Sequence, residues 1–302
     1  MTSLDQAERR GRMIEGPGAR IWAEEIGDRA AVPVLLVHRM AAQCFEWPDE
    51  LLDGLLEAGY RVLVYDHRGF GWSESGPLDT PMLFQNLVDD AKAVLAAFDV
   101  DSVHLVGSSV GGVIARCVAL ECEGVARSLT FLGSSPGDGS LPVWSPEYTE
   151  VAFSPPGPSV DERVDYLVRE LRVMSDARFD EAAAMVRAQR CVRRGWTLDS
   201  LRRVARAAKH RSLGERDLQQ LLSIAVPCLV VHGTHDAVLG VEHGRMLARS
   251  IPGAQYVELA GMGHDIQPHH AAPILEMLLP IMARGDAAVA DHGTAERPRG
   301  SR

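Results

Sequence analysis

A serine flanked by glycines is the most informative chemical feature of this sequence. Gly107, Ser109 and Gly111 form a Gly-x-Ser-x-Gly pattern directly after the apolar run 103–106 and directly before the helical pattern 113–122. A turn this tight forces the serine backbone into a strained conformation that exposes the hydroxyl, and it leaves room only for glycine on either side. N–H groups at the start of the helix would favour negative charge at the same point. The pattern predicts a nucleophile at Ser109.

A serine hydroxyl is a weak nucleophile, so it needs a base, and the base needs an acid that orients it. Asp236 follows the apolar run 228–231, and His264 stands on the glycine-rich segment 261–263. The chain order Ser, Asp, His is one that such triads take. We therefore predict Asp236 as the acid and His264 as the base. Asp138 is an alternative acid, because it also follows an apolar run.

The negative charge that develops on the substrate oxygen requires two N–H donors. By position these are the backbone N–H groups of Val110, after the nucleophile, and of Met40, in the loop after the apolar run 34–37. Arg39 directly precedes Met40 in this loop. Trp144 and Trp196 are further candidates for lining the substrate pocket.

Short apolar runs rich in Val and Leu alternate with helical patterns between residues 31 and 259, which is typical of parallel strands joined by crossover helices. The runs are Val32–His38, Tyr60–Asp66, Val103–Gly107, Ser128–Gly133, Pro227–Gly233 and Gln255–Leu259. A hairpin around Gly16-Pro17-Gly18 is expected at the antiparallel edge. The sequence therefore predicts an α/β fold, a mostly parallel twisted sheet with helices on both faces.

The segment 141–222 contains no strand-like run. After a proline-rich entry it shows helical patterns at Asp161–Met174, Phe179–Arg193 and Leu198–Lys209. We predict an inserted helical cap at 141–222 on a core formed by residues 12–140 and 223–284. Residues 1–11 and 285–302 are predicted to be flexible tails.

Composition narrows the function classes. The 302 residues are 46% hydrophobic and 24% charged, as in folded globular proteins. A net charge of −10 disfavours nucleic acid and anionic membranes as partners. Five cysteines without a Cys-x-x-Cys pair indicate neither a disulfide framework nor a zinc site. We expect a cytoplasmic protein with a small-molecule ester substrate and no membrane partner, metal or cofactor. The oligomeric state is not predicted.

Several segments carry a resemblance to a known family: Trp47–Glu50, Tyr65–Arg68, Val106–Gly111 and Gly261–His264. Over roughly residues 12–284 the chain resembles α/β-hydrolase-fold enzymes. More narrowly it is similar to the aclacinomycin methylesterase group, which removes a methyl ester from a polyketide-derived aromatic compound. The resemblance implies the triad and oxyanion donors named above, a helical cap and no cofactor. Arg39 departs from the pattern, because it stands where the family usually has a glycine. This departure predicts that Arg39 lines or crowds the mouth of the pocket, where it could attract a substrate carboxylate.

These observations predict a serine hydrolase that cleaves a carboxylic ester through an acyl-enzyme, as a methylesterase or carboxylesterase does. The expected substrate is small and apolar, and the resemblance suggests a polyketide origin. Lactonase, thioesterase and C–C bond hydrolase activities use the same triad and stay open as alternatives. A ligand-binding or non-hydrolytic member of the fold is the remaining alternative.

Overall fold

A computed structural model describes residues 9–295 of the protein, apart from 138 and 210–214. These residues form an eight-stranded sheet in the order β1-β2-β4-β3-β5-β6-β7-β8. The strands are β1 (Arg9–Gly16), β2 (Ala19–Ile26), β3 (Val32–Val37), β4 (Tyr60–Tyr65), β5 (Val103–Ser108), β6 (Ala126–Leu132), β7 (Cys228–Gly233) and β8 (Gln255–Leu259). β1 pairs antiparallel with β2, and β2 pairs antiparallel with β4. All the other neighbouring strands, from β4 through β3 to β8, pair in parallel. The predicted α/β fold is confirmed.

Helices cover both faces of the sheet, which explains why its central strands are apolar along their whole length. In β3, Val34 and Leu36 pack into the core on the face covered by α2 (Asp49–Glu57) and α11 (Ala271–Ala295). Leu35 and Val37 pack on the other face, which is covered by α3 (Phe84–Ala97), α4 (Val110–Glu121) and α10 (Glu242–Ser250). The alternation follows from the two-residue period of a strand.

The carboxyl ends of the parallel strands meet at one edge of the sheet, where α/β proteins bind their ligands. The register brings Val37 opposite Gly107 and Ser108 opposite Leu132. The loops after β3, β5 and β6 therefore leave neighbouring strands at the same level. The loops after β7 and β8 extend the same edge.

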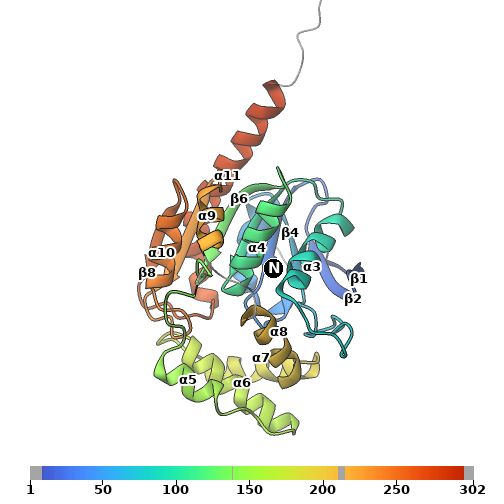
Figure 1. Cartoon of the computed structure of the whole chain (residues 1–302), viewed down its shortest axis with the longest axis vertical. Helices are drawn as coiled ribbons and strands as arrows, with labels where there is room; N and C mark the ends of the chain where they lie inside the picture. The colour runs from blue at the N-terminus through green and yellow to red at the C-terminus, as the bar shows by residue number, and fades with distance from the viewer. Residues whose placement is uncertain (1–8, 138, 210–214, 296–302) are drawn as a thin grey trace, which may run out of the picture.

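Helices replace strands between β6 and β7. We use the name cap helices for α5 (Pro146–Ala152), α6 (Val160–Met174), α7 (Glu181–Arg193) and α8 (Leu198–Lys209), which lie together at one end of the core in Figure 1. Ser159 forms a capping box with Glu162 at the start of α6, and the Asp180 side chain caps α7. α9 (Glu215–Leu222) lies beside α10 on the core, so the chain returns to the core before the predicted end of the cap at residue 222.

The predicted flexible tails are shorter than expected. β1 begins at Arg9, and α11 continues to Ala295, so residues 9–11 and 285–295 have regular structure. In α11, Asp286 accepts hydrogen bonds from Tyr60 Oη at 3.0 Å and His104 Nε2 at 3.1 Å, which fastens the helix to the sheet beyond residue 284. Residues 1–8 and 296–302 lie outside the described residues. No helix within the described ranges is long and apolar enough to cross a bilayer.

The glycines around the β5–α4 turn allow a close approach that yields a testable expectation. A Cβ atom at Gly111 would lie 2.1 Å from the backbone oxygen of Val37 in β3. Gly111→Ala should therefore separate the turn from β3 and lower the free energy of unfolding by about 3 kcal/mol, the upper range for overpacking. Gly240→Ala is the control, because a Cβ there meets nothing within 4 Å. Chemical denaturation measures both, and equal stabilities would contradict the close approach.

Candidate active site

Ser109 occupies the turn between β5 and α4. Its backbone has φ 54° and ψ −124°, a left-handed conformation that is costly for a residue with a side chain. The strain is held in place by neighbours: Ser109 N donates to Leu132 O at 2.9 Å, and Ser134 Oγ donates to Ser109 O at 2.7 Å. Ser109 is partly exposed, whereas Ser108 before it is buried. The turn thus presents the Ser109 side chain at the carboxyl edge of the sheet.

Asp236 and His264 form a buried pair. His264 Nδ1 lies 2.7 Å from Asp236 Oδ2, and the other carboxylate oxygen accepts the backbone N–H groups of Val238 and Leu239 at 2.9 and 2.8 Å. Burial alone would raise the pKa of Asp236, but His264 and His232 outweigh it and hold that pKa well below its usual range. Asp236 is therefore ionised at neutral pH and orients the imidazole through Nδ1, which leaves Nε2 for proton transfer.

Gly133 connects this pair to the nucleophile. A Cβ atom built on Gly133 would lie 3.2 Å from Asp236 Oδ2 and 3.6 Å from His264 Nδ1, so the pair packs against the end of β6. The preceding residue, Leu132, accepts the backbone N–H of Ser109. No hydrogen bond joins Ser109 to His264 among the residues described, and such a bond often forms only with substrate in place. The alternative acid, Asp138, lies outside the described residues.

Both predicted oxyanion donors follow adjacent strands. Val110 is the first residue of α4, where a backbone N–H has no partner within the helix. Met40 lies in the loop after β3, next to Ala41, which has a positive φ of 64°. A Cβ at Gly111 would contact the backbone oxygens of both Val37 and His38, so this loop lies against the start of α4.

Arg39 is almost fully buried, with 7% of its surface exposed. Its Nη2 lies 3.4 Å from Glu46 Oε2, its Nε lies 3.7 Å from Asp265 Oδ1, and its Nη1 donates to Met40 O at 3.3 Å. These contacts are long for charged hydrogen bonds. Arg39 therefore lies under the cap helices, loosely held by two carboxylates.

A cavity of about 10 Å³, room for about one water molecule, lies beneath the cap helices. Its lining comes from the loop after β3 and from the cap: Arg39, Ala41, Glu46, Leu167, Glu170, Leu171, Ala188, Cys191 and Trp196. Tyr148 Oη donates to Glu170 Oε1 at 2.9 Å, and burial raises the pKa of Glu170.

The two predicted tryptophans differ in position. Trp196 is 1% exposed and lines this cavity. Trp144 is 44% exposed and packs against Tyr148 and Phe153 on the cap surface, so the structure does not bring it to the cavity. Sequence reasoning did not identify Glu46, Glu170, Arg187 and Asp265, which surround the site. One available signal was Arg187 itself, a charge within the buried stripe 184–188–191 of α7.

Among the described residues, one group could direct ligand atoms at a common metal ion: Asp176, His269 and His270. His269 Nε2 and His270 Nε2 lie 2.7 and 3.1 Å from Asp176 Oδ2. The backbone N–H of Gln267 donates to His270 Nδ1, which places the proton of that ring on Nε2. In this tautomer the His270 nitrogen that faces Asp176 is a hydrogen-bond donor, so the group acts as a hydrogen-bonded contact between the α6–α7 connection and η2 (Pro268–His270).

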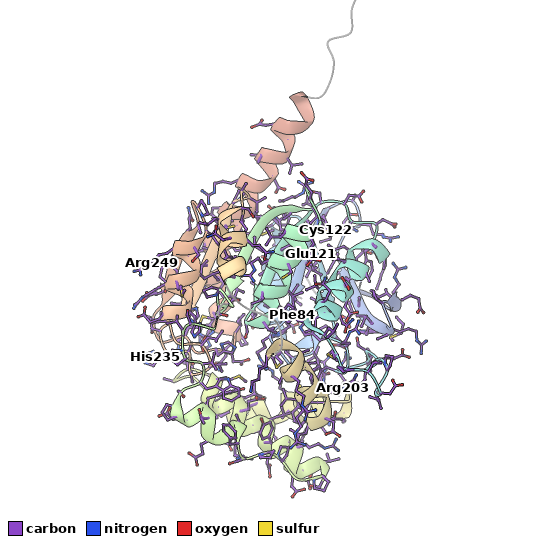
Figure 2. The ribbon with its side chains drawn as sticks, viewed as in Figure 1. Phe84, Glu121, Cys122, Arg203, His235 and Arg249 are labelled. Atoms are coloured by element: carbon purple, nitrogen blue, oxygen red, sulfur yellow. The ribbon has the colours of Figure 1, made fainter. Side chains whose placement is uncertain are left out.

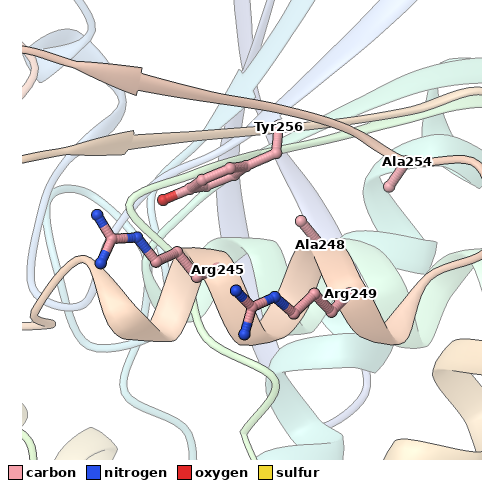
Figure 3. Close-up of a pocket in the computed structure, with 5 residues that line it drawn as sticks. All are labelled: Arg245, Ala248, Arg249, Ala254 and Tyr256. Carbon is pink, nitrogen blue, oxygen red and sulfur yellow. The ribbon is translucent and has the colours of Figure 1, made fainter.

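A pocket of about 310 Å³ on the surface lies apart from these residues. Figure 3 shows it between α10 and β8, lined by Arg245, Ala248, Arg249, Ala254 and Tyr256. Figure 2 labels His235 near the cap helices and Arg249 farther from them. The pocket lies at the amino end of β8, whereas the candidate catalytic residues follow carboxyl ends. Arg245 already pairs with Glu258 at 2.7 Å, so its charge is neutralised.

Comparison with known proteins gives an independent view. A family model for the alpha/beta hydrolase fold matches residues 32–271. The chain is 29% identical over 280 residues to rhodomycin D methylesterase DauP of Streptomyces sp. (strain C5), a match that covers 84% of this chain and 92% of that protein. It is 27% identical over 281 residues to a 2-hydroxymuconate semialdehyde hydrolase of Pseudomonas sp. (strain CF600), covering 92% and 95%.

Among solved structures, the enol-lactonase from Burkholderia xenovorans LB400 matches with a TM-score of 0.73 and 22% identity, over 90% of this chain and all of that one. At this identity the likeness supports the fold. The matches span nearly the whole length of each relative.

Proposed function

Because this chain belongs to the alpha/beta hydrolase fold family, we propose that it is a serine hydrolase that cleaves the carboxylic ester of a small, largely apolar molecule. The observation that carries the proposal is the backbone of Ser109, strained at φ 54° directly between β5 and α4. Such strain is costly and is retained where it serves a site. The buried Asp236–His264 pair at the same edge of the sheet supports it.

In the proposed reaction Ser109 Oγ attacks the ester carbonyl while His264 Nε2 takes the hydroxyl proton. The backbone N–H groups of Met40 and Val110 stabilise the oxyanion of the tetrahedral intermediate, each contributing about 3 kcal/mol. Collapse of this intermediate expels the alcohol, which receives the proton from His264. A water that His264 deprotonates then attacks the acyl carbon. The bond to Ser109 Oγ breaks, His264 returns the proton to Oγ, and the acid is released.

We propose that the cap helices cover the substrate and that Trp196, Arg39 and Glu170 contact it. Leu167, Leu171 and Ala188 of α6 and α7, together with Trp196, form an apolar side of the cavity, which suits an apolar part of the substrate. Arg39 and Glu170 add polar groups that could recognise its oxygen atoms. A methyl ester of a polyketide-derived aromatic compound is the finer proposal, supported by the name of the methylesterase relative.

We extend the proposal to a small-molecule metabolic enzyme of a reducing, cytoplasmic compartment. All five cysteines are free thiols, and four of them are buried. Thiols remain free of disulfides in a reducing compartment.

A panel of substrates tests the proposed reaction. It contains aromatic methyl esters, short p-nitrophenyl esters, lactones, thioesters and 2-hydroxymuconate semialdehyde, the compound that the second relative's name gives as its substrate. We expect methanol release from the methyl esters at a higher kcat/KM than the turnover of any other class. Faster cleavage of the semialdehyde or of lactones would replace the ester assignment. Ligand binding without turnover of any compound would favour a binding protein.

A further inference from the structure

One guanidinium under the cap contacts both loops that hold the proposed catalytic groups. Arg187 of α7 donates Nε to Glu46 Oε2 at 2.7 Å, and it donates Nη1 and Nη2 to the two oxygens of Asp265 at 2.8 Å each. Glu46 is the last residue of the short helix η1 (Cys44–Glu46), which follows the loop that contains Met40, and Asp265 directly follows His264. We propose that Arg187 is a positioning residue that couples docking of α7 to assembly of the oxyanion loop and the His264 loop.

The geometry distinguishes Arg187 from an ordinary surface ion pair. The side chains of Glu46 and Asp265 are each 3% exposed, and that of Arg187 is 20% exposed. Burial alone would raise the pKa of Asp265 and of Glu46, but Arg187 and Arg39 outweigh it and lower both pKa values. Both carboxylates are therefore charged and buried, and such charges need a partner.

Arg39 does not supply the same constraint. It approaches the same carboxylates only at 3.4 and 3.7 Å, whereas Arg187 forms a bidentate pair with Asp265. A bidentate fork fixes direction as well as distance. Removal of Arg187 would leave Arg39 as the nearest cation for two carboxylates and draw it away from Met40 O.

Glu46 and Asp265 each form a further hydrogen bond that holds the segment around them. Glu46 Oε1 accepts the backbone N–H of Gln43 at 2.7 Å, which closes the turn after Met40. The backbone N–H of Asp265 donates to Met174 O at the end of α6, so the residue next to His264 is held against the cap at two points. A shift of α7 would thus move groups on both sides of the substrate carbonyl.

The inference rests on the proposed ester hydrolysis and is tested by Arg187→Ala and Arg187→Lys. We expect Arg187→Ala to lower kcat by about 10- to 100-fold, because a displacement of about 1 Å can cost 10² in rate, with a smaller change in KM. Guanidinium ion at a non-denaturing concentration should restore part of this kcat. The kcat of Arg187→Lys should lie between those of the wild type and Arg187→Ala, because an ammonium keeps the charge but cannot form the bidentate contact. If Arg187→Ala does not fold, Arg187→Lys alone carries the test.

Arg172→Ala is the matched control. Arg172 is also a cap arginine paired with a carboxylate, that of Glu181 at 2.5 Å, but its side chain is 52% exposed. Within the described part of the chain, no ion pair joins it to either loop. Its kcat should stay within about twofold of the wild type, since exposed pairs contribute little. A wild-type kcat in Arg187→Ala, or a folded Arg187→Ala whose lost activity guanidinium leaves unchanged, would overturn the proposal.

Amide hydrogen exchange separates failure of this inference from failure of the proposed function. In Arg187→Ala, residues 39–46 and 262–266 should both exchange faster than in the wild type, and in Arg172→Ala they should not. This readout requires no ester substrate. If the wild type hydrolyses no ester, the proposed function fails while the coupling is still measured; if exchange changes in neither loop, or in only one, the coupling is wrong.

Discussion

Ser109→Ala is expected to reduce ester hydrolysis by at least about 10³-fold, because removal of a triad nucleophile leaves only oxyanion stabilisation and binding to act on the substrate. The fold should persist. Alanine can occupy the turn and keep both hydrogen bonds of the Ser109 backbone, from its N–H to Leu132 O and from the Ser134 hydroxyl to its carbonyl oxygen. The substitution therefore removes the nucleophilic hydroxyl and very little packing.

Rates with p-nitrophenyl esters and thermal unfolding, measured on the same preparations, check this expectation. Ser250→Ala is the control, because Ser250 lies in α10 away from the proposed site, where its Oγ donates to Met246 O. A folded Ser109→Ala variant that retains more than about a tenth of the wild-type rate would be incompatible with a serine nucleophile at this position.

Asp236→Asn should lower kcat by about 10⁴-fold, the loss seen when a triad aspartate becomes an amide and the imidazole takes the wrong tautomer. An asparagine that keeps Oδ1 on the N–H groups of Val238 and Leu239 turns its NH₂ toward His264 Nδ1. This reverses the donor and acceptor roles of the pair. Nε2 then carries the proton and cannot accept one from Ser109.

The pH dependence gives the same assignment a second readout. Because His264 and His232 hold the pKa of Asp236 well below its usual range, Asp236 stays ionised throughout the pH range in which an imidazole titrates. The acid limb of log kcat/KM in the wild type should therefore fall with a slope of one.

Asp138→Asn is the matched control for the alternative acid. If Asp138→Asn loses ester hydrolysis and Asp236→Asn does not, Asp138 and not Asp236 is the acid of the triad.

Local signals in the sequence were sufficient for much of the fold. α8 has the predicted bounds Leu198–Lys209, and α6 starts one residue before its predicted start at Asp161. Such helices carry an apolar stripe and a polar residue at the start, both of which are visible in sequence. α5, at Pro146–Ala152, was not predicted, because it has one buried side chain and therefore almost no stripe.

The tails show a different limit. The segment after Arg284 lacks an apolar period, which favours a flexible tail, yet α11 continues to Ala295. Its attachment depends on Asp286, which receives hydrogen bonds from Tyr60 and His104, 226 and 182 residues away in the chain. Sequence patterns do not show which distant polar groups will meet.

The same limit applies to the site. The position of Ser109 between a strand and a helix could be predicted because glycine spacing and two neighbouring elements lie within one short segment. The ion pairs of Arg187 could not be predicted, because Glu46 is 141 residues and Asp265 is 78 residues away in the chain. Nor could composition separate Trp144 from Trp196, which share a residue type and differ in burial through the packing of the cap helices.

Covalent labelling of the wild type with an alkyl fluorophosphonate, followed by intact-mass measurement and peptide mapping, tests the central claim most directly. The reagent phosphonylates a serine only where a base and oxyanion donors activate it. We predict one adduct per chain, located on Ser109, and no adduct in Ser109→Ala. A folded wild type that takes up no adduct, or takes it up at another residue, would contradict the assignment of Ser109 as the nucleophile.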